Sequence, residues 1–400
     1  MSNLRELDAA LDAAKKSCAI VFFTSATCGP CRALYPLYDE LSAEVANKGS
    51  LIKVDISQAQ DVGSKYSIKG TPTFITFLRG EKESEWMGAD PAKLRGNVGL
   101  LVQMAWPRHP HEGLYLPSFA DPSTKPSLYG KVAPLPKLMA KMGDTAKDPV
   151  VQGLTNFLET RSNAGPAEAV LPDMAQVASF MQRSLKQLPV ELVFTIVDLL
   201  RCCVVDPRVS GYFAEERDHA TIQAILKFAI SQADCPYSLR LMTLQMTCNL
   251  FSSPLFGEGV LSSPSLRACI VQLVSSSFLD DSHANVRVAT SSLVYNLALS
   301  SGKARREGTG ETLPEDDEVE IAASVLEAIA QEEASADALR RMLLALGQLA
   351  YCTPLDGQLA DLLCVMDAEG TIAGKKKQFP GETLVAELGL ELLGKGLRKP

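Results

Sequence analysis

Hydrophobic residues in the first hundred positions form short helix and strand patterns that alternate along the chain. Leucine and alanine recur at helical spacing over residues 4–14, and the continuous apolar run at 19–23 is typical of a buried strand. The alternation continues with strand patterns at 51–56, 71–78 and 83–86 and helical patterns at 34–45, 61–66 and 91–104. This order predicts an α/β fold built around a parallel core.

From about residue 148 onward the patterns are helical, with no clear strand. The strongest helical patterns cover residues 174–186, 189–204, 221–231, 238–251, 265–278, 285–299, 317–331, 336–351, 355–366 and 383–397. Helix pairs recur roughly every 40 to 50 residues, which favours an all-α stack of armadillo or HEAT type. The segments 238–251 and 285–299 echo each other, because each has an Arg near its start and an Asn nine residues later.

Two segments break these patterns. Seven prolines fall within residues 107–136, which indicates a linker or an extended lead-in to the helical part. Residues 301–318 mix charges without apolar periodicity, so we expect a flexible loop there.

Composition narrows the function classes. The chain is 46% hydrophobic and 22% charged, as in globular proteins, with a net charge of −8 and a pI near 5.3. An acidic chain is a poor general binder of nucleic acid or anionic membranes. No apolar stretch reaches membrane-spanning length and no signal-peptide core is present, so we expect a cytoplasmic or nuclear location. In such a reducing compartment most of the ten cysteines should be free thiols.

Cys28-Gly29-Pro30-Cys31 is the strongest chemical motif, and it follows a predicted strand and opens a predicted helix. A helix N-terminus stabilises a thiolate on the first cysteine, and the second can then resolve a mixed disulfide. A bare Cys-x-x-Cys could instead be half of a zinc site, but no second pair stands at zinc spacing. We therefore predict redox chemistry at Cys28 and Cys31, with no metal and no cofactor.

With this motif in place, residues 1–107 resemble a thioredoxin domain. Gly70-Thr71-Pro72-Thr73 matches the family loop whose cis-proline faces the cysteines, which implies a substrate-binding role for Thr71 and Pro72. The resemblance also makes Gly88 a groove residue and gives Lys53 the position of the family's buried lysine.

Two departures from the thioredoxin pattern leave the activity of this site open. Phe22 stands where the family has a buried acid that assists the second cysteine, and Thr27 replaces the usual tryptophan. The site is therefore either a working disulfide reductase or an inherited scaffold used for binding.

The helical part, from about residue 125 to 398, resembles a PUL domain, an armadillo-like module of ubiquitin-pathway adaptors. The resemblance is carried by the segments 129–142, 248–253 and 285–299. It implies binding to the C-terminal tail of an AAA ATPase segregase, valosin-containing protein. The candidate contacts are two arginines and two asparagines of the echoed helices, which could instead cap or cross-link helices: Arg240, Arg287, Asn249 and Asn296.

We therefore expect a thioredoxin domain at 1–107, a Pro-rich linker at 108–128 and a PUL domain at 129–398. The predicted function is a thiol–disulfide oxidoreductase module coupled to a segregase adaptor in the ubiquitin–proteasome pathway. Its expected partners are the segregase tail, protein disulfide or thiol clients and thioredoxin reductase, with no nucleic acid and no membrane. One alternative is a non-enzymatic interaction protein that uses the thioredoxin fold as a docking platform. Another is a sensor in which oxidation of Cys28 and Cys31 alters the helical domain.

Overall fold

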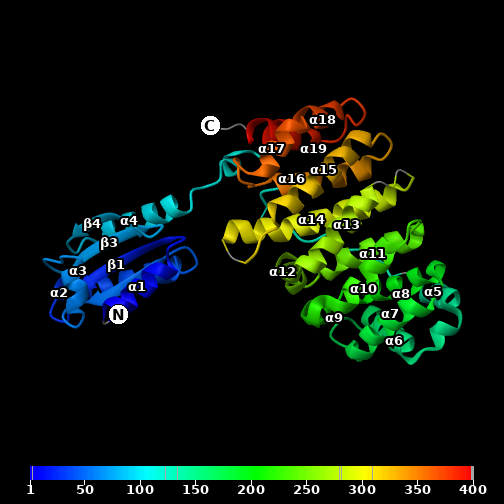
Figure 1. The fold of residues 1–400 in the computed structure, drawn as a ribbon, viewed down its shortest axis with the longest axis horizontal. Coiled ribbons are helices and arrows are strands. Elements are labelled where there is room, and N and C mark those ends of the chain that lie inside the picture. The colour runs from blue at the N-terminus through cyan, green and yellow to red at the C-terminus, as the bar shows by residue number, and fades with distance from the viewer. Residues whose placement is uncertain are drawn as a thin grey trace. The chain divides into compact units, whose positions relative to one another are not determined.

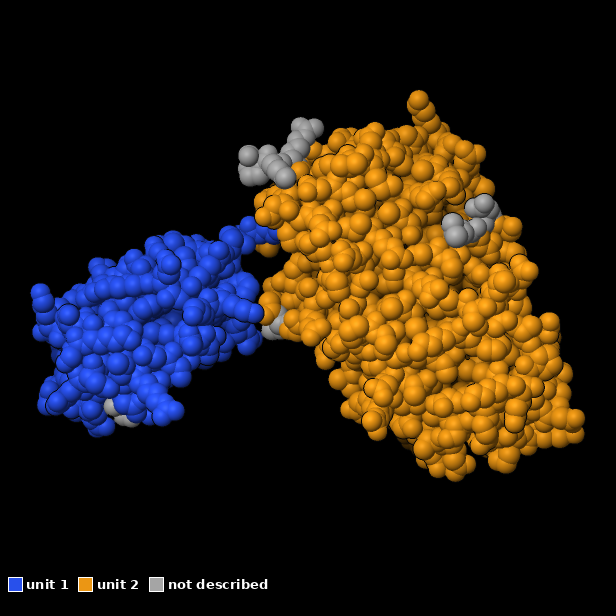
Figure 2. Space-filling model, viewed as in Figure 1, with its two compact units in different colours: residues 1–109 blue, residues 110–400 orange. Residues whose placement is uncertain are grey.

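A computed structural model describes residues 1, 3–121, 123–132, 134–278, 280, 282–308 and 310–397. The chain divides into two compact units, residues 1–109 and residues 110–400 (Figure 2). Pro122, one of the clustered prolines, and residue 398, the expected end of the helical domain, lie outside the described residues. Within the described residues, no helix combines the length and apolarity needed to span a membrane.

The first unit is a sheet of four strands in the order β2-β1-β3-β4 with helices on both faces (Figure 1). Its elements are α1 (Leu4–Ala13), β1 (Cys18–Thr24), α2 (Gly29–Glu44), β2 (Ser50–Asp55), α3 (Gln60–Lys65), β3 (Thr73–Leu78), β4 (Glu81–Met87) and α4 (Pro91–Ala105). The predicted α/β alternation is therefore confirmed.

The sheet is mixed, which corrects the expected parallel core. Only β1 and β2 pair in parallel, whereas β3 pairs antiparallel with both β1 and β4. The connection between β3 and β4 is Arg79-Gly80, and both residues have positive φ, 51° and 87°. Such a two-residue turn fits the twist of a hairpin, whereas a parallel crossover needs a dozen or more residues.

Every residue of β1 is buried, so this strand forms the centre of the core. On one face Phe22 packs in a cluster with residues of α2 and α4, including Leu34 and Leu94. On the other face Val21 packs with residues of α1 and α3, including Leu7. The helix that starts at Cys28 is thereby fixed to the end of the central strand.

In the described residues of the second unit, all regular secondary structure is helical. Its elements are η1 (Pro110–Gly113), α5 (Leu135–Met142), η2 (Gly143–Lys147), α6 (Pro149–Asn163), α7 (Met174–Gln187), α8 (Val190–Cys203), α9 (Pro207–Glu215), η3 (Arg217–His219), α10 (Ala220–Ser231), α11 (Tyr237–Leu250), α12 (Pro254–Ser262), α13 (Pro264–Phe278), α14 (Ala284–Glu307), α15 (Glu315–Gln331), α16 (Ala336–Ala350), α17 (Gln358–Val365), α18 (Ala368–Gly374), α19 (Leu384–Ala386) and the π-helix η4 (Glu387–Lys395). Helices α8, α11, α14 and α16 stack in one layer, and α7, α10, α13 and α15 stack in a second layer (Figure 1).

Helix α14 is longer than its apolar pattern predicts and continues to Glu307, which corrects the flexible loop expected at 301–318. Polar contacts rather than apolar periodicity hold this extension. The Ser301 hydroxyl accepts a hydrogen bond from the Leu313 N–H, and Arg305 pairs with the buried carboxylate of Glu318.

Residues 110–121 and 123–131 pack on the helices of the second unit instead of forming a free linker. This corrects the linker expected at 108–128 and agrees with the other expectation, an extended lead-in to the helical part. The His111 ring is fully buried and accepts a hydrogen bond from the Cys352 N–H through Nδ1. Phe119 covers Gly347 of α16 so closely that an added Cβ would lie 2.1 Å from its ring. Residues 125–131, which we call the strap, have no regular secondary structure and cross α14, α11 and α8.

Candidate functional sites

The first candidate site is the cysteine pair at the start of α2. Cys28 is the N-cap residue of this helix, and its Sγ accepts a hydrogen bond from the Cys31 N–H at 3.1 Å. The two cysteines form a disulfide with their Cα atoms 5.3 Å apart. Cys28 is 8% exposed and Cys31 is fully buried. The helix N-terminus and this N–H favour negative charge on Cys28 Sγ, which makes it the nucleophile after reduction.

The predicted substrate loop adjoins the predicted groove glycine. The Thr71–Pro72 bond is cis, and the Pro72 carbonyl accepts a hydrogen bond from the Gly88 N–H at 2.9 Å. Gly88 has a φ of 115°, a conformation that side chains other than glycine rarely adopt. The structure therefore brings Pro72 and Gly88 together, with the side chain of Met87 58% exposed beside them.

An aromatic stack replaces the acid behind the cysteines. Phe22 is fully buried, and its ring stacks on Phe74 with centroids 4.6 Å apart. Trp86 stacks on the other face of Phe74 at 5.0 Å. Cys28 and Cys31 belong to the same buried cluster as these rings. The interior behind Cys31 is therefore apolar, which disfavours a second thiolate there.

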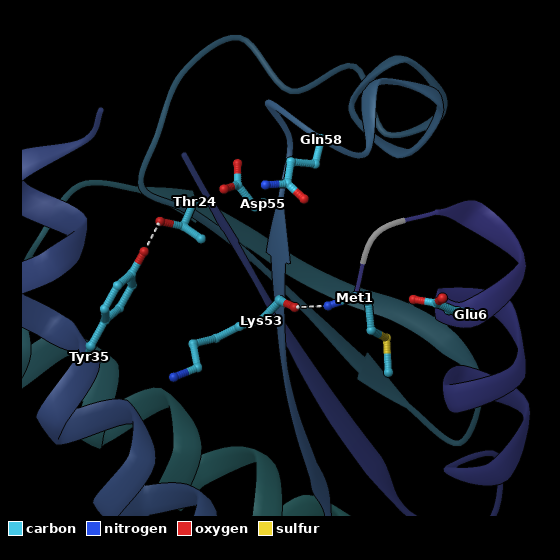
Figure 3. Close-up of a pocket in the computed structure, with 7 residues that line it drawn as sticks. All are labelled: Met1, Glu6, Thr24, Tyr35, Lys53, Asp55 and Gln58. Atoms are coloured by element: carbon cyan, nitrogen blue, oxygen red, sulfur yellow. Dashed lines mark hydrogen bonds between the residues drawn. The ribbon is translucent and has the colours of Figure 1, made fainter. Parts of the chain in front are cut away.

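Lys53 does not take the buried place that the thioredoxin resemblance implies. It pairs with Phe22 across the parallel strands, but its side chain is 36% exposed. Its Nζ lies 2.6 Å from an Asp39 carboxylate oxygen and 5.1 Å from the Tyr35 ring centroid. Figure 3 shows Lys53 beside an open hollow at the carboxyl ends of β1 and β2, where the hydroxyls of Tyr35 and Thr24 share a hydrogen bond of 2.8 Å.

The second candidate site is the lane of α8, α11 and α14 that holds the strap. The Asn296 side chain accepts from the Ser127 N–H at 2.6 Å and donates to the Ser127 carbonyl at 3.0 Å. Asn249 makes the same pair of bonds with Tyr129, at 2.6 and 3.1 Å. Both asparagines are fully buried. The predicted asparagines therefore bind an extended segment, but its source in this structure is the chain itself.

The two predicted arginines cross-link helices, the alternative role left open by the sequence. Arg240 donates to the Ser276 carbonyl of α13 at 2.8 Å. Arg287 forms an ion pair of 2.8 Å with Glu332, whose side chain is 1% exposed. Neither guanidinium lies in the lane beside the asparagines.

Arg201, which the sequence analysis did not select, completes the strap contacts at the end of α8. Its Nη1 donates to the Tyr129 and Lys131 carbonyls at 2.8 and 3.1 Å, while its Nε donates to Asp198 at 2.7 Å. The spacing along the chain could have identified this residue. Arg201 stands 48 residues before Asn249, and Asn249 stands 47 residues before Asn296.

The buried cysteines outside the Cys28–Cys31 pair show no sign of a reactive or metal site among the described residues. Burial raises the pKa of the Cys203 and Cys248 thiols well above their ordinary value. No group of three or more His, Cys, Asp or Glu side chains stands where it could hold a metal ion in the described part of the chain. Buried thiols of this kind behave as small apolar side chains.

Comparison with known proteins gives the class of each unit. The PUL domain family model matches residues 122–391, which is more than half of the chain, and the thioredoxin family model matches residues 3–98. The chain belongs to the PUL domain family and carries an N-terminal thioredoxin domain.

Individual relatives cover the first unit. Thioredoxin of Homo sapiens is 38% identical over 93 residues, which span 23% of this chain and 88% of that protein. The TPR repeat-containing thioredoxin TDX of Arabidopsis thaliana is 37% identical over 95 residues, which span 23% of this chain and 25% of that protein. The solved structure of Fasciola hepatica thioredoxin covers 25% of this chain and 95% of its own, with 28% identity and a TM-score of 0.24.

Proposed function

We propose that this protein is a thiol–disulfide oxidoreductase module coupled to an adaptor domain that binds the C-terminal tail of an AAA ATPase segregase, valosin-containing protein. The observation that carries the redox part is the position of Cys28 at the N-cap of α2, bonded to the Cys31 N–H. The thioredoxin family match and the adjoining Pro72 and Gly88 support it.

The reaction follows from the different accessibility of the two sulfurs. After reduction, the Cys28 thiolate attacks one sulfur of a client disulfide, forms a mixed disulfide and releases the other client sulfur as a thiolate. The Cys31 sulfur then attacks Cys28 Sγ, which re-forms the Cys28–Cys31 disulfide, and the Cys31 proton passes to the second client sulfur as it leaves. Two electrons pass to the client, and a dithiol reductant or thioredoxin reductase restores the pair of thiols.

Capture of the intermediate tests these roles. The full chain with Cys31→Ser should accumulate a covalent adduct with insulin as the disulfide client, because the resolving sulfur is absent. The adduct should be visible on a non-reducing gel and disappear with dithiothreitol. The matched variant Cys28→Ser should form none, because fully buried Cys31 cannot reach the client. Equal adducts in both variants would refute the assignment.

The adaptor part rests on the PUL family match and on two cations, Lys125 at the start of the strap and Arg341 of α16. Lys125 and Arg341 line a small polar hollow together with Tyr295. Two cations at a solvent-facing hollow suit a carboxylate-rich peptide end, even though the chain as a whole is acidic. We therefore shift the expected tail contacts from Arg240 and Arg287 to Lys125 and Arg341.

Titration of a synthetic segregase tail peptide into the full chain tests the adaptor. Binding should weaken in Arg341→Glu and stay unchanged in Lys137→Glu, an exposed cation elsewhere on the same unit. A folded chain that binds neither the tail peptide nor a longer tail fusion would remove the segregase partner.

A second candidate function is a non-enzymatic docking platform. The aromatic stack of Phe22, Phe74 and Trp86 favours it, because the stack supplies no proton acceptor for Cys31. In that case the exposed surface around Met87 would hold a client without turnover. Turnover of insulin separates the two functions.

We further propose a cytoplasmic or nuclear location. The eight cysteines outside the Cys28–Cys31 pair are free thiols, as proteins of reducing compartments carry. Imaging of a fluorescent fusion tests this, and export into an oxidising compartment would contradict it.

A further inference from the structure

The strap is held by its backbone. Asn296 and Asn249 each bond the N–H and the carbonyl of one strap residue, and the two residues held, Ser127 and Tyr129, are two positions apart. Alternate residues of an extended segment point their backbone groups to the same side. The lane therefore accepts an extended chain without demanding particular side chains at most positions.

The strap itself buries little. None of the described residues from 123 to 132 is buried, and the side chain of Leu128, between the two held residues, is 40% exposed. The half-buried residues of this stretch are Thr124, Pro126, Ser127 and Tyr129. The Tyr129 hydroxyl also lies 3.0 Å from the Ser292 Oγ of α14. The strap is thus a peptide held by hydrogen bonds and one aromatic anchor.

The lane does not depend on the strap for its shape. The Asn249 Nδ2 also donates to the Arg201 carbonyl at 3.0 Å, and the Asn296 Nδ2 to the Cys248 carbonyl at 3.2 Å. Arg201 is oriented by its bond to Asp198 inside α8. Side chains fixed by their own unit in this way are pre-organised to bind a peptide.

We propose that this lane is a peptide-binding groove that the strap autoinhibits. Its occupant in trans is an extended peptide with a small residue at the Asn296 position and a phenol side chain two residues later, as in Ser127 and Tyr129. The strap is tethered to the groove and therefore competes with a free peptide at high effective concentration. The apparent affinity for the free peptide is the intrinsic affinity multiplied by the fraction of molecules whose groove is open. This proposal depends neither on the redox chemistry of the first unit nor on which segregase the second unit binds.

A strap that cannot bind the asparagines tests this in the full chain. Proline has no N–H, so the double variant Ser127→Pro, Tyr129→Pro removes both bonds to the asparagine oxygens and leaves the groove intact. Leu128→Pro is the matched control, because it places a proline between these residues at an amide that neither asparagine accepts. The probe is a fluorescein-labelled synthetic peptide carrying residues 123–132, and binding is read by fluorescence anisotropy.

The double variant should bind the probe at least about tenfold more tightly than the wild-type chain or the Leu128→Pro control. Adding Asn249→Ala and Asn296→Ala should abolish that gain, and a probe with phenylalanine or alanine at the tyrosine position should bind progressively more weakly. A folded double variant that binds no more tightly than wild type would overturn the proposal, because the strap would then be a fixed part of the domain.

Amide hydrogen exchange on the wild-type chain keeps the test decisive if the double variant does not fold. The proposal requires the Ser127 and Tyr129 amides to exchange by local opening, faster than the amides of α11 and α14. Exchange of these two amides only on global unfolding of the helices would overturn it. Neither readout involves the segregase or a disulfide, so failure here is distinguishable from failure of the proposed function.

Discussion

Truncation of Asn249 gives a quantitative test of how the strap contributes to the helical unit. Asn249 is fully buried and makes three hydrogen bonds, one from the Tyr129 N–H and two to the Tyr129 and Arg201 carbonyls. A typical net hydrogen bond contributes about 1 kcal/mol, so Asn249→Ala should lower the free energy of unfolding of this unit by about 3 kcal/mol. Water reaching the half-buried strap would reduce this value, whereas an unsatisfied Arg201 carbonyl would increase it.

The chain provides separate signals for its two units. Both tryptophans, Trp86 and Trp106, lie in the first unit, so tryptophan fluorescence follows its unfolding. Far-ultraviolet circular dichroism is dominated by the larger helical unit. In urea titrations Asn249→Ala should shift the circular dichroism midpoint and leave the fluorescence midpoint in place. Gln272→Ala, at an exposed position of α13 in the same unit, should cost less than about 0.5 kcal/mol, as surface substitutions do. An Asn249 effect no larger than this control would refute the role of the strap contacts.

Four further substitutions, one of them a comparison variant, test other parts of the account. Phe22→Ala should destabilise the first unit by about 3–5 kcal/mol by opening a cavity, and an unchanged fluorescence midpoint would contradict the aromatic stack. Arg287→Ala leaves the buried Glu332 carboxylate without its cation and should lower the stability of the helical unit by about 3–5 kcal/mol. Arg240→Ala loses one hydrogen bond to a carbonyl and should cost about 1 kcal/mol. Equal urea midpoints for the two variants would contradict this difference. Burial raises the pKa of Glu332, but the Ser335 and Ala334 N–H groups and Arg287 outweigh burial and hold it below its ordinary value. Its contribution to stability is therefore present above about pH 4.3 and is lost as the pH falls through the lowered pKa. Glu332→Gln should lower the free energy of unfolding at neutral pH and make it depend less on pH in the acid range. If the pH dependence is the same as in the wild-type chain, Glu332 is not its cause.

The sequence was most informative where one local rule decided the structure. Apolar periodicity located most of the long helices of both units, because each of them buries a continuous face, but α6 was not among the strongest patterns. The cysteine motif and its place between β1 and α2 were also readable, since a strand followed by Gly29-Pro30 leaves few alternatives for the next turn. The thioredoxin and PUL resemblances are both confirmed by the family matches.

What could not be predicted depends on contacts between distant residues. The prolines around the strap suggested a linker, because proline-rich segments lack regular structure whether or not they are bound. The partners of Ser127 and Tyr129 lie 169 and 120 residues away, so no local pattern announces them. The repeated asparagines did indicate a peptide-binding surface, but not that the chain supplies its own peptide. Helix α14 similarly continued past its apolar pattern because Ser301 and Arg305 found tertiary partners.

Insulin reduction by the full chain tests the central claim most directly. The rate would be measured with dithiothreitol or thioredoxin reductase as the electron source, for the wild-type chain, Cys28→Ser and the matched surface variant Cys364→Ser, whose thiol is exposed on the helical unit. The proposed function predicts turnover above the reductant alone in wild type and Cys364→Ser, and loss of that excess in Cys28→Ser. A wild-type rate no higher than that of the reductant alone would contradict an oxidoreductase and leave the thioredoxin unit as a docking platform.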